Sequence, residues 1–339
     1  MNRLALAFVL AFTAHTSQAQ DIHFTQFDAS PLIVNPAFTG NFSGQWRAAA
    51  VYRNQWPGIA NGFKTYGVSF DAPVVQDLSH DDFLAAGIQL YNDRAGDGNL
   101  QNMSALASIA YHKFLGANID KALSVGFQGG YTQKSFDITR LRFPNHFDNG
   151  QFIPNPIEGL GTKLEYFTLN AGISWAHSLG SRFGYAIGLG ANNINQPGES
   201  FSNKPQADAL LAMRYTAQVG AIAYLSDKFS LRPAVLYQQQ AAADEIVAGN
   251  EFHLIVGNPE FRNFTTAVFL GGWYRMDDAV MINAGLEFKG MRLGVSYDYN
   301  VSELDAATNG NGGFEISLIY LAPDPLDFAR KRIYPCSRF

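Results

Sequence analysis

The chain of 339 residues is 47% hydrophobic and 14% aromatic but only 16% charged, and it is long enough for two ordinary domains or one large β domain. Its formal net charge of −5 argues against nucleic acid as a partner. Its single cysteine, Cys336, excludes an intramolecular disulfide, so stability must come from the sheet itself.

Residues 1–19 have the three parts of a secretory signal peptide. Asn2-Arg3 supplies the charged start, residues 4–12 the apolar core, and residues 17–19 the small side chains before a cleavage site. The apolar core is too short to cross a bilayer as a helix. We therefore expect export of the chain and cleavage after about Ala19.

Residues 20–44 show no sustained period and contain Asn35-Pro36 and Gly40, so we expect an ordered arm before the first strand. The sequence up to residue 321 then alternates between polar and apolar side chains in roughly fourteen stretches separated by Gly, Pro, Asn and Asp. We predict strands at Gln45–Tyr52, Lys64–Asp71, Phe83–Tyr91, Leu100–Lys113, Lys121–Gln133, Tyr166–His177, Arg182–Ala191, Ala209–Leu225, Phe229–Gln240, Glu245–Val256, Phe264–Tyr274, Val280–Phe288, Met291–Tyr299 and Gly313–Leu321.

The two predicted strands 280–288 and 291–299 give the clearest pattern. A two-residue turn at Lys289-Gly290 places apolar partners on one face and brings Glu287 opposite Arg292 on the other. Each strand has the length that a tilted strand needs to cross a bilayer. The hairpin alone fits either a soluble sandwich, with its apolar face in the core, or a membrane barrel, with its apolar face toward lipid.

The rest of the chain favours the barrel. Long and short connections broadly alternate, as they do in outer-membrane barrels, and aromatic residues often lie near the ends of apolar faces. We therefore predict a single antiparallel transmembrane β-barrel of about fourteen strands. The polar face then lines the lumen, where we favour structural packing over a path for a substrate. The expected lumen-facing residues are Gln128, Arg214, Gln218, Gln238, Glu287, Arg292 and Asp298.

The sequence offers little sign of catalysis or metal binding. Its histidines are scattered, and it has no HExxH, GxSxG or paired-cysteine motif. His146, Asp148 and Ser200 are possible rim residues, but nothing joins them into a catalytic set. The polar cluster 92–99 is a turn or, as the weaker alternative, a calcium loop. We expect no enzyme activity and no cofactor.

Several motifs resemble the PorP/SprF family of type IX secretion membrane proteins, and the match runs over nearly all of the mature chain. They include QDIHFTQF, the C-terminal GFEISLIYL and RKRIYPCSRF, and three motifs with candidate family residues: PLIVNPAFTG with Asn35 and Pro36, YRNQWPGI with Asn54, Gln55, Trp56 and Pro57, and INQPGESF with Asn195, Gln196 and Pro197. The order Pro335-Cys336 departs from the Cys-Pro order associated with the family.

The resemblance implies an outer-membrane protein of a Gram-negative bacterium that acts in type IX secretion or gliding motility. It implies as partners outer-membrane lipid, periplasmic secretion components and the C-terminal domain of a large surface adhesin or other cargo. We then expect four parts in the chain: a signal peptide (1–19), a periplasmic arm (20–44), a barrel (45–321) and a basic periplasmic tail (322–339). A porin or transporter for a small solute is the alternative function.

Two parts of the chain are candidate protein-binding sites. The loops 134–165 and 192–208 can contact cargo, or else form a lid over a filled barrel. The tail is either a partner-binding segment or a solvated basic end. Its candidate residues are Arg330, Lys331, Arg332 and Arg338.

Overall fold

The computed structural model describes most of the expected barrel and of the arm that precedes it. The described residues are 22–59, 61–79, 82–116, 119–141, 147–148, 151–152, 161–202, 209–256, 266–302 and 308–323. The expected signal peptide and residues 324–339, which include all four tail candidates, lie outside this part of the chain.

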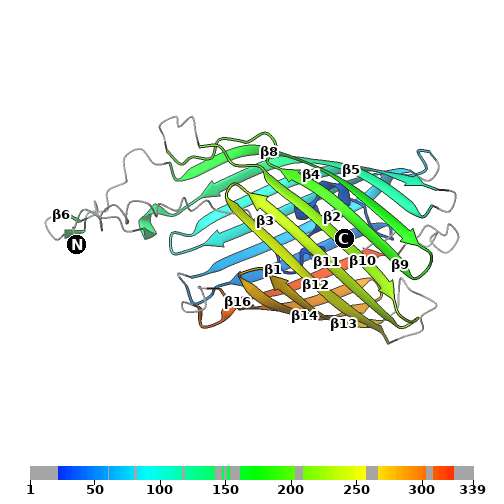
Figure 1. Cartoon of the computed structure of the whole chain (residues 1–339). Helices are drawn as coiled ribbons and strands as arrows, with labels where there is room; N and C mark the ends of the chain where they lie inside the picture. Colours follow the sequence, from blue (N-terminus) through cyan, green and yellow to red (C-terminus); the bar gives the residue numbers. More distant parts are fainter. Residues whose placement is uncertain are drawn as a thin grey trace, which may run out of the picture.

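Within the described residues, fourteen antiparallel strands close into one barrel in sequence order, and β1 pairs with β16 (Figure 1). The strands are β1 (Trp46–Gln55), β2 (Phe63–Val75), β3 (Phe83–Ala95), β4 (Leu100–Leu115), β5 (Lys121–Ser135), β8 (Lys163–Leu179), β9 (Phe183–Asn192), β10 (Arg214–Tyr224), β11 (Phe229–Gln240), β12 (Ala243–Ile255), β13 (Ala267–Arg275), β14 (Ala279–Phe288), β15 (Met291–Asn300) and β16 (Asn311–Ala322). The short pair β6 (Phe147–Asp148) and β7 (Gln151–Phe152) forms a separate hairpin between β5 and β8.

Helical structure is restricted to single turns in the described residues. Three follow one another before β1: η1 (Phe27–Ala29), α2 (Pro31–Val34) and η2 (Pro36–Phe38); η3 (Ile138–Arg140) follows β5. In the part of the chain that the structure describes, no helix has the length and hydrophobicity to cross a membrane.

The barrel prediction is confirmed, and the largest error at a strand start is in β10. This strand begins at Arg214 instead of Ala209. Leu211 donates its backbone N–H to the carbonyl of Pro197, at 2.9 Å, and Gly198 forms an isolated bridge with Leu210. Residues 209–211 therefore belong to the β9–β10 connection, because their backbone groups bond within that connection.

The β14–β15 hairpin has the register that the sequence predicts. Phe288 pairs with Met291, and Glu287 with Arg292. Lys289 and Gly290 both have positive φ, of 49° and 83°, as a two-residue type I′ turn requires. The apolar face points outward, where Ile282 keeps 59% of its surface exposed. This exposure excludes the sandwich, in which the same face packs against a second sheet.

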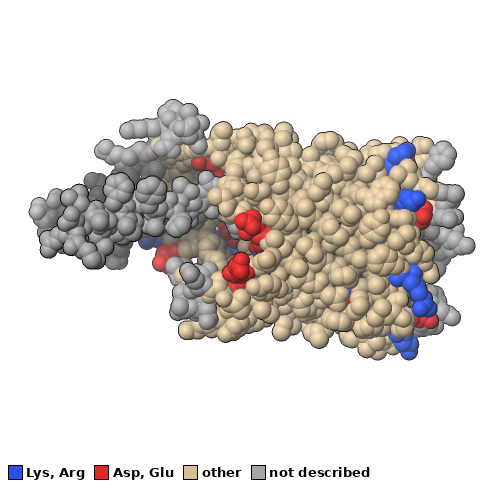
Figure 2. Space-filling model, in the orientation of Figure 1, with Lys and Arg blue, Asp and Glu red and all other residues tan. Residues whose placement is uncertain are grey.

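Outward-facing apolar side chains continue around the wall. Phe127, Leu189 and Leu270 are each more than half exposed, whereas alternate residues on the same strands point inward and are buried. Figure 2 shows the consequence on one face of the molecule: most of the visible Lys and Arg lie near its right-hand end, and the wall between the two ends carries few charges. Such an apolar belt suits contact with lipid acyl chains.

The two ends of the barrel differ in their connections. We name the end where β1 begins and β16 finishes the proximal end, and the opposite end the distal end. The longest connections, 136–162 and 193–213, both lie at the distal end. The proximal connections include the tight turns 180–182 and 289–290, although 256–266 is longer. The two longest connections are thus distal, but the alternation is incomplete, because the distal turns 241–242 and 276–278 are also short.

Asp82 organises the proximal connection between β2 and β3. Its carboxylate accepts hydrogen bonds from the Tyr111 hydroxyl at 2.6 Å and from the Phe114 backbone N–H at 2.9 Å, and it lies 3.3 Å from Lys113 Nζ. Burial acts to raise the pKa of Asp82, but these bonds outweigh it and hold the pKa below its ordinary value. The turn is thus fixed to the end of β4.

A charge on the outer face tests the lipid contact. Val295 lies in the middle of β15 and is exposed, whereas Val301 is equally exposed just beyond the strand. We expect Val295→Arg to lower the free energy of unfolding by about 2–4 kcal/mol, and Val301→Arg by about 0–1 kcal/mol, because the cost depends on depth in the bilayer. Urea unfolding in lipid vesicles measures both. Equal effects of the two variants contradict the lipid-facing assignment.

Candidate functional site

The lumen of the barrel contains the chain's own N-terminal arm, residues 22–44 (dark blue in Figure 1). Leu32, Ala37 and Phe38 in this arm are completely buried. Its side chains form hydrophobic clusters with inward-facing residues of the strands; Phe27, for example, packs edge-on against Trp273 at 5.3 Å between ring centroids. The segment that we expect to be a periplasmic arm therefore lies, over its described residues, inside the barrel.

Near the proximal end, strand side chains bind the backbone of the arm. Arg47 pairs with Asp71 at 2.8 Å, and its Nη2 also donates to the carbonyl of Phe38 at 3.0 Å. The Asp71 carboxylate accepts the N–H of Gly40 at 2.6 Å. His112 Nε2 lies 2.7 Å from the carbonyl oxygen of Thr39. These bonds satisfy backbone groups that belong to no sheet and have limited access to water.

Asn35 and Pro36, the first predicted family pair, form the turn at the centre of the arm. Asn35 is fully buried; its Oδ1 accepts the N–H of Ala37 at 2.9 Å, and its Nδ2 donates to carbonyls of β8 and β9 at 3.2 and 3.1 Å. Glycines of the barrel wall face this turn. A Cβ on Gly172 would lie 1.9 Å from Asn35 Oδ1, and one on Gly126 would lie 2.4 Å from the Pro36 carbonyl. These glycines leave the space that the turn occupies.

A buried ionic cluster holds the arm on the other side of the lumen. Glu315 on β16 accepts the backbone N–H groups of both Thr25 and Gln26 at 2.8 Å. Asp298 accepts the Thr25 hydroxyl at 2.8 Å, and Arg53 on β1 pairs with both carboxylates, at 2.9 and 3.2 Å. All of these groups are almost completely buried. The arrangement is compensated, because each charge has a partner of opposite sign and further hydrogen bonds.

The predicted pair of Glu287 and Arg292 lies in a second cluster nearer the proximal end. Their side chains approach to 2.7 Å. Arg292 also lies 2.9 Å from Glu251 and 3.0 Å from Asp28 of the arm. Arg292 on β15 thus connects β14 and β12 with the arm. The sequence pattern alone indicates only the pair with Glu287.

The candidate residues of the other two motifs lie toward the distal end, although Arg53 of YRNQWPGI contacts the arm. Trp56 and Pro57 form the distal β1–β2 turn, next to Asn54 and Gln55 at the end of β1; Trp56 has a positive φ of 49° and packs edge-on against Phe63. Asn195 lies in the distal β9–β10 connection with Gln196 and Pro197. Its side chain bonds the backbone of Leu169 and Phe167 on β8 at 2.9 and 2.7 Å. The candidate residues of the three motifs therefore occupy three separate positions in the fold and do not form one site.

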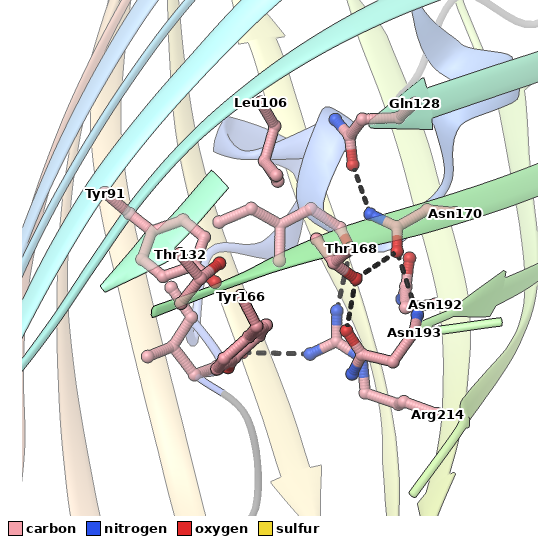
Figure 3. Close-up of a pocket in the computed structure, with 12 residues that line it drawn as sticks. Tyr91, Leu106, Gln128, Thr132, Tyr166, Thr168, Asn170, Asn192, Asn193 and Arg214 are labelled. Carbon is pink, nitrogen blue, oxygen red and sulfur yellow. Dashed lines mark hydrogen bonds between the residues drawn. The ribbon is translucent and has the colours of Figure 1, made fainter. Parts of the chain in front are cut away.

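A small cavity lies beside the arm in the distal half of the lumen (Figure 3). The space between its lining atoms is about 400 Å³, a volume that includes open solvent. Asn170 donates to Gln128 at 2.7 Å, and Thr168 donates to Asn193 at 2.7 Å. Its lining residues, mostly polar or aromatic, are Ile22, Ile33, Tyr91, Leu106, Gln128, Thr132, Tyr166, Thr168, Asn170, Asn192, Asn193 and Arg214.

Sequence reasoning missed most of the residues that hold the arm. Thr25, Arg53 and Glu315 lie within QDIHFTQF, YRNQWPGI and GFEISLIYL but are not among the candidate residues of those motifs. Glu251 belongs to no recognised motif, and only its inward phase on β12 distinguishes it. His146 and the candidate tail lie outside the described residues. In the described part of the chain, no group of three or more His, Cys, Asp or Glu side chains is arranged to hold a metal ion.

An apolar outer wall, a closed antiparallel sheet and a lumen filled with polar side chains together define a transmembrane β-barrel. Residues 16–320 match the family described as type IX secretion system membrane protein PorP/SprF. The chain belongs to this family. No curated protein matches the chain at the level of sequence.

Three solved structures are similar to this chain at low sequence identity. The toluene transporter TbuX from Ralstonia pickettii is 9% identical, with a TM-score of 0.48 over 86% of this chain and 92% of that one. The COG4313 outer membrane channel from Pseudomonas putida F1 is 12% identical, with a TM-score of 0.41 over 82% and 94% of the two chains. CdiB from Acinetobacter baumannii is 9% identical with a TM-score of 0.41, and the match spans 81% of this chain but only 59% of CdiB.

The glycine wall can be tested with a single methyl group. We expect Gly172→Ala to displace Asn35 and to lower the free energy of unfolding by about 1–3 kcal/mol, as overpacking does. Gly272→Ala is the matched control, because a Cβ there meets no atom within 4 Å. Urea unfolding followed by tryptophan fluorescence compares the two. The packing account fails if both variants unfold like the wild type.

The ionic cluster gives a second prediction. Glu315→Gln leaves a buried Arg53 with one carboxylate fewer, so we expect a loss of about 3 kcal/mol in the free energy of unfolding. Arg182→Gln serves as the control: Arg182 lies 3.7 Å from Asp227 at an exposed position, and we expect little change. The same unfolding assay applies. A Glu315→Gln protein as stable as the Arg182→Gln protein contradicts the proposed role of this cluster.

Proposed function

We propose that this protein is a non-enzymatic component of the outer membrane of a Gram-negative bacterium, where it helps to secrete or anchor a specific large surface protein. The cargo, an adhesin or similar protein of the type IX secretion and gliding-motility machinery, is recognised through its C-terminal domain. The family match over residues 16–320 carries the proposal. The barrel architecture supports the outer membrane as its location, because closed barrels span that membrane.

The filled lumen supports anchoring over the alternative, a porin or transporter for a small solute. In the described residues, the arm and the buried polar side chains around it occupy the interior. Arg53, Glu251 and Glu315 are each about 99% buried or more, so they do not line a water-filled path. A wide porin instead keeps such side chains in contact with water.

The orientation of the barrel separates two expected binding regions. Barrels with both termini in the periplasm carry short turns on that side and longer loops outside. The distal connections, including 134–165 and 192–208, then face the exterior and meet the cargo. The proximal end faces the periplasm, where the tail residues Arg330, Lys331, Arg332 and Arg338 are suited to an acidic surface of a secretion component.

Deletion of the gene tests the secretion role. We expect one or a few large surface proteins to disappear from the cell surface while the remaining surface proteome stays unchanged. Quantitative mass spectrometry of proteins released by surface proteolysis provides the measurement, and a wild-type gene copy provides the control. An unchanged surface proteome contradicts the proposal.

Planar-bilayer recording separates the anchor from the solute transporter. We expect the purified wild-type barrel to give no steady conductance, because the arm fills its lumen. A barrel lacking residues 22–44 provides a comparison in which that obstruction is removed. Steady conductance of the intact protein, at the level of a solute channel, favours the transporter instead.

A further inference from the structure

Asn250, near the middle of β12, places a polar side chain on the lipid-facing side of the wall. The next residue, Glu251, points inward and is buried, whereas Phe252 is exposed. Side chains alternate along a strand, so Asn250 lies on the same side as Phe252. The other outward-facing Asn, Gln and charged side chains of the described strands lie toward strand ends, as Asn54 and Gln133 do. In those strands, Asn250 is thus the polar exception within the apolar belt.

The amide of Asn250 is not satisfied by the described part of the chain. Its Oδ1 is buried and has no hydrogen-bond partner among the described residues. On a wet surface, water supplies the missing bonds, but lipid acyl chains offer neither donors nor acceptors. A polar side chain at this depth therefore gains free energy when it bonds to another protein surface in the membrane. The amide thus points to a protein partner within the bilayer.

The residues around Asn250 leave room for such a partner. Its cross-strand neighbours are Pro233 on β11 and Gly272 on β13, the strands on either side of β12 (Figure 1). Ala248 precedes it on the same face. A Cβ on Gly272 would meet no atom within 4 Å, so the space beside the amide is open. We call these four residues the Asn250 patch. Small residues of this kind let two membrane proteins approach closely.

We propose that the Asn250 patch is the interface through which two copies of this chain associate in the membrane. A primary amide both donates and accepts hydrogen bonds. In two copies related by a two-fold axis along the membrane normal, Nδ2 of each Asn250 can therefore donate to Oδ1 of the other. The open space at Gly272 gives the side chain room to turn its oxygen outward. Both copies span the same bilayer, so the two amides lie at the same depth.

A second copy suits the patch better than lipid or an unrelated barrel. Barrel walls are apolar at this depth, so an unrelated barrel has no group to bond the amide. The exposed side chains of Phe252, Leu270 and Ile282 extend the contact around the patch. They add little specificity, because lipid tails solvate them as well as a protein does. The amide pair therefore supplies the specificity, and the inference does not rest on the secretion proposal.

Förster transfer between labelled barrels in lipid vesicles measures this association. Donor and acceptor dyes are attached to separate preparations of the full chain through Arg182→Cys, at an exposed proximal turn, in a Cys336→Ser background. Transfer is followed as the ratio of lipid to protein is raised. With the native patch, we expect transfer that falls along a monomer–dimer curve and that unlabelled protein abolishes by competition.

Variants of the patch test whether the amide and the open space are responsible. We expect Asn250→Leu to weaken association by about tenfold, and Asn250→Gln, which keeps the amide, to retain most of it. Gly272→Leu should also weaken it, because the added side chain holds the second copy away. Val125→Leu, at an exposed position of β5, is the matched control and should associate like the wild type. The heat-dependent shift of the barrel on gels verifies that each variant is folded.

Two results overturn the proposal. The first is transfer from the native patch that unlabelled protein does not reduce, because the barrel is then a monomer and lipid or another protein covers the patch. The second is association of folded Asn250→Leu and Gly272→Leu as tight as that of the wild type, which places any dimer contact elsewhere on the wall. Neither result bears on the surface-proteome experiment, so failure here is distinguishable from failure of the secretion proposal.

Discussion

The structure depends on hydrogen bonds from the barrel wall to the backbone of an irregular segment. The arm has no strand partner, so most of its N–H and C=O groups need another acceptor or donor inside a lumen with little room for water. Glu315 accepts two successive N–H groups, and Arg47 and Thr216 donate to the carbonyls of Phe38 and Val34. Without these side chains, burial of the arm would leave polar groups unsatisfied at a cost of roughly 1–3 kcal/mol each.

This requirement explains why the inner wall combines three kinds of residue. Charged side chains bind the backbone N–H groups of Thr25 and Gln26 and the carboxylate of Asp28, and glycines leave space for the turn at Asn35-Pro36. Small apolar residues such as Ala85 and Ala122 belong to the same hydrophobic cluster as Phe27 and Phe38 of the arm. A lumen built for solvent needs none of this complementarity. The same features that hold the arm therefore favour a structural or anchoring role in our proposal over passage of a solute.

The wall of the barrel could be predicted from the sequence because strand periodicity is local. Alternation of two residues determines which side of β14 and β15 faces out, and a two-residue turn then determines their pairing. The same alternation correctly predicts that the side chains of Gln128, Gln218 and Asp298 face the lumen, where they are buried. Strand boundaries do not follow from alternation alone: the start of β10 differs from the prediction because residues of a connection can continue the alternation while their backbone groups bond elsewhere.

The position of the arm could not be predicted in this way. Its contacts join residues that are far apart in the sequence, as the bond from Thr25 to Glu315 across 290 positions illustrates. The inward glycines on β5, β8 and β9 indicate that something approaches the wall, but not which segment does. Asn35 and Pro36 were identified from a motif, and only the fold shows that they fill this space.

Directed disulfide formation tests the position of the arm most directly. Thr39 in the arm and Ser108 on β4 have hydroxyl oxygens 2.8 Å apart, whereas Ser296 faces inward on β15, several strands away around the wall. In a Cys336→Ser background, mild oxidation should join Thr39→Cys to Ser108→Cys, and mass spectrometry should detect the linked peptides. The account predicts this link and none between Thr39→Cys and Ser296→Cys. Absence of the first link in a folded barrel would contradict an arm inside the lumen.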